Sequence, residues 1–305
     1  MAGYILRRIL AFIPLIWAIA TITFFLMHAV PGGPFDQEKP LPEATKRNLE
    51  ARYNLDGSLL EQYGTFLQNL VKGDLGISFN QDRPVTDIVR ERLPKTLQLG
   101  LCAFVFALVG GLTLGVVSAV NQNRWPDYLG VFVATVGAAV PNFVVGVFLI
   151  IFLALKLGWF DVLGWEFGNP RKMVLPTVAL GLLPLAFIAR ITRASMLEVL
   201  RQDYIRTARA KGLQEFKIIV RHAIRNALIP VLTVAGPILA GLITGSFVIE
   251  RFFAVGGIGT AFVDAVMLRD YGMIMGTTLL YAIAIAVVNL LVDVAYGIAD
   301  PRIRY

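Results

Sequence analysis

Six apolar runs, each close to the length that crosses a bilayer, restrict the folds open to this chain of 305 residues more than any other feature. They cover about residues 9–30, 96–120, 129–157, 174–191, 228–249 and 273–298. About 20 apolar residues in a helix cross the ~30 Å of hydrocarbon in a membrane. Charged residues make up only 16% of the chain, against about 25% in soluble domains. We therefore predict an all-α integral membrane protein with six helices and a single domain over residues 1–305.

Prolines should disturb the third and fourth runs, and the first run resembles a signal peptide. Pro141 should kink the third run, and Pro176 and Pro184 make the fourth the least regular. Membrane helices tolerate proline where neighbouring groups satisfy the freed backbone. The first run exceeds the roughly 7–15 apolar residues of a signal peptide. We expect it to stay as an uncleaved first membrane helix.

The distribution of basic residues predicts the orientation. Cytoplasmic loops of membrane proteins carry an excess of Lys and Arg. With six crossings, one side carries Arg7, Arg8, Arg124, the block from Arg190 to Arg225, Arg302 and Arg304. That side should be cytoplasmic, with both termini on it. Residues 31–95, 158–172 and 250–272 should then be external.

Residues 31–95 form a large insert with nine basic and ten acidic residues. Apolar residues recur at helical spacing over 59–71 and again over 85–93, and Gly73-Asp74-Leu75-Gly76 separates the two stripes. We expect two short amphipathic helices on the external face of the membrane. They could form a structural cap or a docking surface for an external protein.

The chain lacks the motifs of the common catalytic sites. It has no phosphate-binding Gly-x-x-x-x-Gly-Lys-Ser/Thr, no His-Glu-x-x-His and no Gly-x-Ser-x-Gly. Cys102 is the only cysteine, and His28 and His222 lie far apart. We expect no catalytic, cofactor-binding or metal-binding residues. The net charge of +7 follows the predicted cytoplasmic loops, which favours anionic lipid over nucleic acid as a partner.

Asp293 is the clearest acidic residue inside a predicted span. An acid within a membrane is costly and is a candidate for function. Arg190 or Arg193, at a similar predicted depth, could form a structural ion pair with it. Alternatively, the chain is a proton-coupled secondary carrier, and Asp293 takes part in proton transport.

A basic segment from Asp203 to Pro230 separates the fourth and fifth runs. Between Arg190 and Arg225 there are nine Lys/Arg and three Asp/Glu, so this stretch holds most of the net charge. At helical spacing, Tyr204, Thr207, Ala208 and Lys211 share one face, and Gly212 is a suitable helix stop. The pattern fits a helix that contacts a soluble partner, or a helix that lies on the membrane surface without one.

This segment resembles the cytoplasmic loop of bacterial ABC-importer permeases, the EAA loop. Arg206 stands where the general pattern has Glu, and Arg225 where it has Pro, and both departures match the oligopeptide, dipeptide and nickel branch. Further stretches resemble this branch: Leu6–Ile9, Ala29–Gly32, Gly73–Phe79, Ala189–Met196, Glu250, Gly256–Gly259, Arg269–Tyr271 and Asp300–Tyr305. Gly256 replaces a proline that the branch usually has.

The resemblance implies a MetI-like type I importer permease with six helices and an external helical insert, most similar to the permeases of oligopeptide importers. It also implies a second homologous permease, two ABC ATPase subunits that bind ATP and Mg, and an external peptide-binding protein, all at a bacterial inner membrane. Oligopeptides are the implied substrates, with dipeptides, glutathione or chelated nickel as alternatives. This subunit itself would be non-catalytic.

Two groups of residues take roles from the resemblance. Contact with the ATPases, within the loop 203–225, is implied for Tyr204, Arg206, Thr207, Ala208, Arg209, Lys211, Gly212, His222 and Arg225. An external gate loop is implied for Glu250, Gly256, Gly257, Gly259, Arg269 and Asp270.

Overall fold

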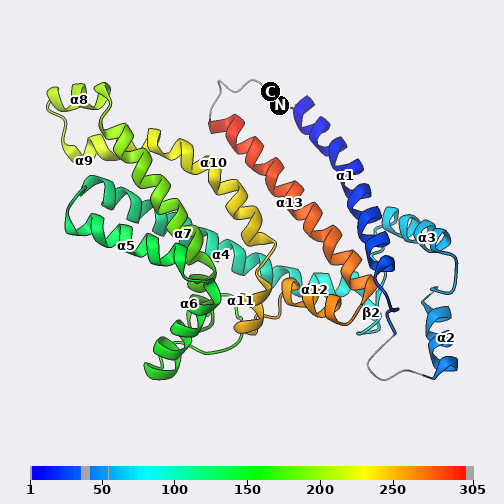
Figure 1. Cartoon of the computed structure of the whole chain (residues 1–305). Helices are drawn as coiled ribbons and strands as arrows, with labels where there is room; N and C mark the ends of the chain where they lie inside the picture. The colour runs from blue at the N-terminus through cyan, green and yellow to red at the C-terminus, as the bar shows by residue number, and fades with distance from the viewer. Residues whose placement is uncertain (1, 36–41, 54, 300–305) are drawn as a thin grey trace. The chain divides into compact units, whose positions relative to one another are not determined.

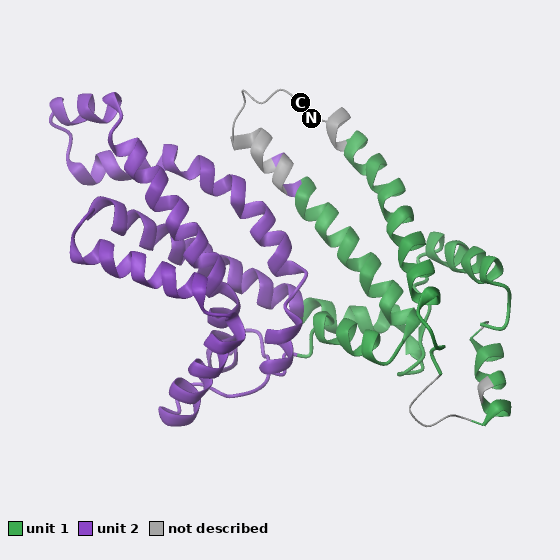
Figure 2. Ribbon diagram, in the orientation of Figure 1, with its two compact units in different colours: residues 1–95, 256–290, 305 green, residues 96–255, 291–304 purple. Residues whose placement is uncertain are grey.

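The computed structural model describes residues 2–35, 42–53 and 55–299 and is almost entirely helical. The all-α fold expected from the sequence is confirmed. We expected a single domain, but the chain divides into two compact units (Figure 2). Unit 1 comprises residues 1–95 and 256–290, and unit 2 comprises residues 96–255 and 291–304.

Unit 1 contains the first long helix, α1 (Ala2–Ala29), and the larger part of the last one, α13 (Tyr271–Ala299). Its smaller elements are α2 (Glu43–Arg52), α3 (Leu59–Val71), the antiparallel pair β1 (Ile77–Ser78) and β2 (Arg83–Pro84), and α12 (Ile258–Met267). Buried Val85, Ile88 and Val89 pack against α12 and the start of α13. Helix α3 begins with a capping box in which Ser58 and Glu61 exchange hydrogen bonds, which stabilises its first turn.

Unit 2 is arranged around α7 (Pro170–Leu200), which packs against α5 (Trp125–Ala139), α6 (Asn142–Leu149) and α10 (Ile224–Ile243). A π-helix, η1 (Ile150–Lys156), continues α6. The chain leaves α7 through α8 (Asp203–Ala210), and α9 (Glu215–Ile218) and the π-helix η2 (Ile219–Ala223) lead into α10 (Figure 1). Helix α11 (Phe247–Phe252) ends the unit.

Helix α4 (Val85–Val120) runs through both units, and its glycines allow α7 to approach closely. A Cβ at Gly111 would lie 2.8 Å from the Cβ of Ile188, and one at Gly115 would lie 2.5 Å from the Cβ of Thr192. Both distances are too short for real atoms, so the Gly111-x-x-x-Gly115 spacing serves packing within this chain. A Cβ at Gly241, by contrast, would meet nothing within 4 Å.

Five helices of the described chain are long and apolar enough to cross a membrane. They are Leu6–Ala29, Val85–Val120, Pro170–Leu200, Glu215–Ile243 and Tyr271–Leu291. The second amphipathic stripe of the insert is therefore not a separate helix but the first turns of α4. The fifth span ends at Ile243 rather than at 249, because Gly245 turns the chain with φ +82°.

The third expected span is not a kinked helix. Its halves, Trp125–Ala139 and Asn142–Lys156, meet at 110°, so a sixth span exists only if this bent pair crosses as one. Val140 is extended (φ −89°, ψ 124°), as steric contact with the ring of a following proline requires. Pro141 then starts a new helix in a new direction.

Candidate functional site

Helix α8 ends as the sequence predicted, at Gly212. This glycine has φ +75°, a left-handed conformation that costs glycine little. Its N–H donates to the carbonyl of Arg209 at 2.9 Å, and the N–H of Leu213 donates to the carbonyl of Ala208 at 3.3 Å. These two bonds form a Schellman motif, which satisfies the last carbonyls of the helix and fixes the exit direction of the chain.

One side of α8 is buried in the core of unit 2. Ile205 and Ala208, exposed by 0% and 8%, pack in a cluster with Met196, Ile218 and Ala223. Ala208 thus packs mainly on its own chain, and its expected contact with an ATPase groove stays a prediction. The exposed side of α8 carries Tyr204, Arg206, Thr207, Arg209, Ala210 and Lys211.

Polar contacts join the two halves of the basic loop. Arg209 Nε lies 2.7 Å from Glu215 Oε1, and Asn226 Nδ2 donates to the hydroxyl of Tyr204 at 2.7 Å. His222 is half-buried in η2, and Arg225 is exposed in the first turn of α10. Asn226 was not among the predicted residues, because no sequence pattern indicates that it meets a tyrosine 22 positions earlier. The contacts hold α8 against the start of α10.

Arg193 forms an ion pair with Asp127. Its Nε lies 2.6 Å and its Nη2 2.8 Å from the two carboxylate oxygens of Asp127. The hydroxyl of Ser118 and the backbone N–H of Asn123 also donate to this carboxylate. The Asp127 side chain is only 3% exposed. The network ties the α4–α5 turn to α7, and the sequence analysis missed it.

Of the other two residues of the expected ion pair, the structure describes only the side chain of Arg190. Arg190 is exposed on α7. The side chain of Asp293 falls outside the described residues, as do residues 300–305 with Arg302 and Arg304. Arg193 therefore has a partner 66 residues earlier along the chain, and the expected pairing of Arg190 or Arg193 with Asp293 stays a prediction.

Asp270 connects two of the motifs that resemble the permease branch, and both lie in unit 1. Its carboxylate accepts hydrogen bonds from the Ser78 hydroxyl and from the backbone N–H groups of Phe79, Asn80 and Met273. The bond from Met273 caps the N-terminus of α13, where negative charge is favourable. One buried carboxylate thus holds the β1–β2 turn against the start of α13.

The remaining residues of the expected gate loop are divided between the units. Glu250 belongs to unit 2, where it is fully buried and accepts a hydrogen bond from Thr96 Oγ1 at 2.8 Å. Gly256, Gly257, Gly259 and Arg269 belong to unit 1. Gly256 and Gly257 precede α12, Gly259 lies in its first turn, and Arg269 follows its end. Gly256 and Arg269 have positive φ values of 67° and 53°.

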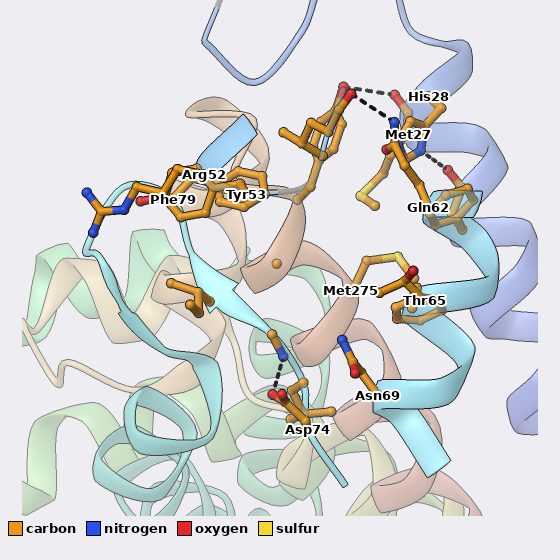
Figure 3. A pocket seen from close by; sticks show the side chains of 18 residues that line it. Met27, His28, Arg52, Tyr53, Gln62, Thr65, Asn69, Asp74, Phe79 and Met275 are labelled. Carbon is orange, nitrogen blue, oxygen red and sulfur yellow. Dashed lines mark hydrogen bonds between the residues drawn. The ribbon is translucent and has the colours of Figure 1, made fainter. Parts of the chain in front are cut away.

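Unit 1 encloses a cavity of about 250 Å³ between the ends of α1 and α13, the helix α3 and strand β1 (Figure 3). Aromatic rings, including Tyr53 and Phe79, line it together with polar groups. His28 Nε2 lies 3.3 Å from Gln62 Oε1 at its rim. Gln62 Nε2 donates to the carbonyls of Leu55 and Gly57, which fixes the orientation of the amide.

No cluster in the described residues has the composition of a metal centre, since none groups three or more His, Cys, Asp or Glu. The arrangement offers instead a short basic helix, α8, with one buried and one exposed side, held between α7 and the start of α10.

Comparison with known families gives two matches that together cover nearly the whole chain. Residues 111–305 match "Binding-protein-dependent transport system inner membrane component", and residues 1–100 match the N-terminal component of such systems.

Curated relatives align over the full length. The chain is 46% identical to the dipeptide transport system permease protein DppB of Bacillus subtilis, over 100% of this chain and 98% of the relative. It is 44% identical to the oligopeptide transport system permease protein OppB of Escherichia coli K12, over 100% of both chains.

Solved structures share the fold. The MetNI methionine ABC transporter in inward-facing conformations matches with a TM-score of 0.58 at 20% identity, over 70% of this chain and 96% of that chain. An amino acid ABC transporter with histidines matches with a TM-score of 0.53 at 16% identity, over 69% of this chain and 93% of that chain.

Proposed function

Since this chain belongs to the family of binding-protein-dependent inner membrane transport components, we propose that it is the permease subunit of an ABC importer for peptides. Relatives named for dipeptides and for oligopeptides, both more than 40% identical over the full length, support peptides as the substrate class. The subunit supplies part of the membrane pathway. ATP hydrolysis takes place in separate ATPase subunits, and an external binding protein delivers the peptide.

The geometry of α8 carries the coupling part of this proposal. A contact helix must present an exposed face to its partner and must not move independently of the membrane helices. Helix α8 meets both needs, because Ile205 and Ala208 are buried against Met196 of α7 while Thr207, Ala210 and Lys211 stay exposed. Force applied to the exposed side is therefore transmitted to α7 and, through η2, to α10.

In this mechanism the exposed side of α8 contacts an ATPase subunit on the cytoplasmic face. Closure of the ATPases displaces α8, and the packed helices of unit 2 move with it. Together with a second permease, this movement exposes the pathway alternately to the two sides of the membrane. The basic character of residues 190–225 supports the cytoplasmic placement of this end.

A bulky residue on the exposed side of α8 tests the proposal. Ala210→Trp should leave the fold intact, because Ala210 is exposed, but should block close approach of an ATPase. The matched control is Gln68→Trp, which adds the same ring to the exposed side of α3 in unit 1.

The assay measures ATPase co-purification, peptide uptake and phosphate release with the complete importer in liposomes. We expect Ala210→Trp to lose ATPase attachment, or to hydrolyse ATP without uptake, while Gln68→Trp behaves as the parent. Full uptake by Ala210→Trp with normal ATPase attachment would exclude α8 as the coupling element.

A further inference from the structure

An apolar cavity of about 360 Å³ lies in unit 2 between α4, α7 and α10. Its wall is almost free of polar groups, and its volume is in the range of small-ligand pockets. The residues around it are Leu112, Thr113, Val116 and Val117 of α4, Thr192 and Met196 of α7, and Ile224, Ala227 and Leu228 of α10.

Two exposed arginines lie about one helical turn along the chain from residues that line this cavity. Arg221 precedes Ile224 by three residues, and Arg225 precedes Leu228 by three, so each lies beside a lining residue on the helix surface. Neither arginine forms an ion pair within the described part of the chain, whereas the neighbouring Arg206 and Arg209 pair with Asp203 and Glu215. Two cationic groups are therefore available next to an apolar recess.

The position along the helix places these arginines at the depth of lipid headgroups. The helical segment from Glu215 to Ile243 has 29 residues, about 43 Å at the usual rise, and exceeds the ~30 Å of hydrocarbon. Residues 227–243 contain no charged side chain and account for the hydrocarbon part. Phe216 and Val220, exposed by 75% and 48%, add apolar contacts at the same level. Aromatic and basic side chains gather in this way at membrane interfaces.

We propose that this cavity and the two arginines form a binding site for an anionic phospholipid. The phosphate lies at Arg221 and Arg225, and part of an acyl chain fills the recess between α4, α7 and α10. The occupant is a lipid rather than a soluble anion, because the charged part of the site continues directly into the apolar part. The site adjoins the loop that carries α8, so the lipid would stabilise the packing on which α8 depends.

The test uses the full chain purified in detergent, with native mass spectrometry of bound lipid. The probes are phosphatidylglycerol and phosphatidylcholine with identical acyl chains. We expect retention of phosphatidylglycerol to exceed that of phosphatidylcholine roughly thirty-fold, the factor expected for two cations near an anionic surface. Equal retention of the two lipids would overturn the proposal.

Two variants test the contacts of the headgroup and of the acyl chain separately. Arg221→Gln with Arg225→Gln should abolish the preference for phosphatidylglycerol, and Val117→Phe should reduce retention of both lipids by filling the recess at a partly exposed position. The charge control is Lys72→Gln with Arg90→Gln in unit 1, and the volume control is Val105→Phe on the exposed side of α4. Unchanged retention in both site variants would overturn the assignment.

Two competitors address the other possible occupants. Inorganic phosphate at millimolar concentration should not displace phosphatidylglycerol, and displacement would mean that the site holds a free anion only. Addition of the second permease should leave the lipid bound. Loss of the lipid on assembly would show that the recess is a contact between subunits and would also overturn the proposal.

Discussion

The ion pair of Asp127 and Arg193 should contribute more to the free energy of unfolding than any surface pair of this chain. Removing one partner of a buried ion pair costs about 3–5 kcal/mol. Asp127 is 3% exposed but Arg193 is 29% exposed, so water compensates part of the loss. The carboxylate also accepts hydrogen bonds from Ser118 and Asn123, which the change to an amide weakens. We therefore expect Asp127→Asn to lower the free energy of unfolding by about 2–3 kcal/mol.

A double-mutant cycle isolates the pair from these other bonds. Asp127→Asn, Arg193→Gln and the double variant are heated in detergent with lipid, and the midpoint of unfolding is measured. Each single change should lower the midpoint by roughly 4–12 °C for a unit of this size. The double variant should lose about 2 kcal/mol less than the sum of the single changes.

The matched control is the exposed pair of Arg171 and Asp161 in the same unit, whose side chains are 60% and 38% exposed. Asp161→Asn should cost less than about 1 kcal/mol, as is usual for surface pairs. Strict additivity in the Asp127 and Arg193 cycle, or an equal loss in the control, would refute the reasoning from burial.

Three further predictions follow from backbone geometry and unsatisfied groups. Gly212→Val should destabilise the end of α8 by about 1–2 kcal/mol, since φ is +75° there, and Gly212→Asn should cost less. Limited proteolysis of the loop 203–225 measures this, and equal cleavage of both variants would contradict it. Thr192→Val should raise the free energy of unfolding by about 1 kcal/mol, and with it the unfolding midpoint, because the buried Thr192 hydroxyl has no partner among the described residues. A lower midpoint would instead indicate a hydrogen bond of this hydroxyl. Gly272→Ala should loosen the β1–β2 turn, because a Cβ there would overlap the carbonyl oxygen of Ile77, and faster chymotrypsin cleavage after Phe79 is the expected readout.

Local patterns predicted local structure well. Gly212 follows a short helix-forming stretch, and no other residue nearby tolerates the left-handed conformation as easily, so the stop could be located from the sequence. The EAA-like segment was likewise recognisable, because its residues are contiguous. The membrane helices followed from the lengths of their apolar runs.

Contacts between distant residues could not be predicted in this way. Asp127 sits just outside an apolar run, and nothing in its neighbourhood indicates an arginine 66 positions later. Asp293, deeper in a run, therefore looked like the better partner. The burial of Ala208 could not be predicted either, because helical spacing shows which residues share a face, whereas the face that packs on the core depends on Met196 and Ile218.

The 110° turn at Pro141 has a consequence for the far end of the chain. The five long helices are an odd number of crossings, so they alone would leave the two termini on opposite sides of the membrane. If the bent pair adds a crossing, the number of crossings becomes even and both termini lie on the same side of the membrane. The path of α5 and α6 thus determines on which side α13 ends, more than 100 residues later.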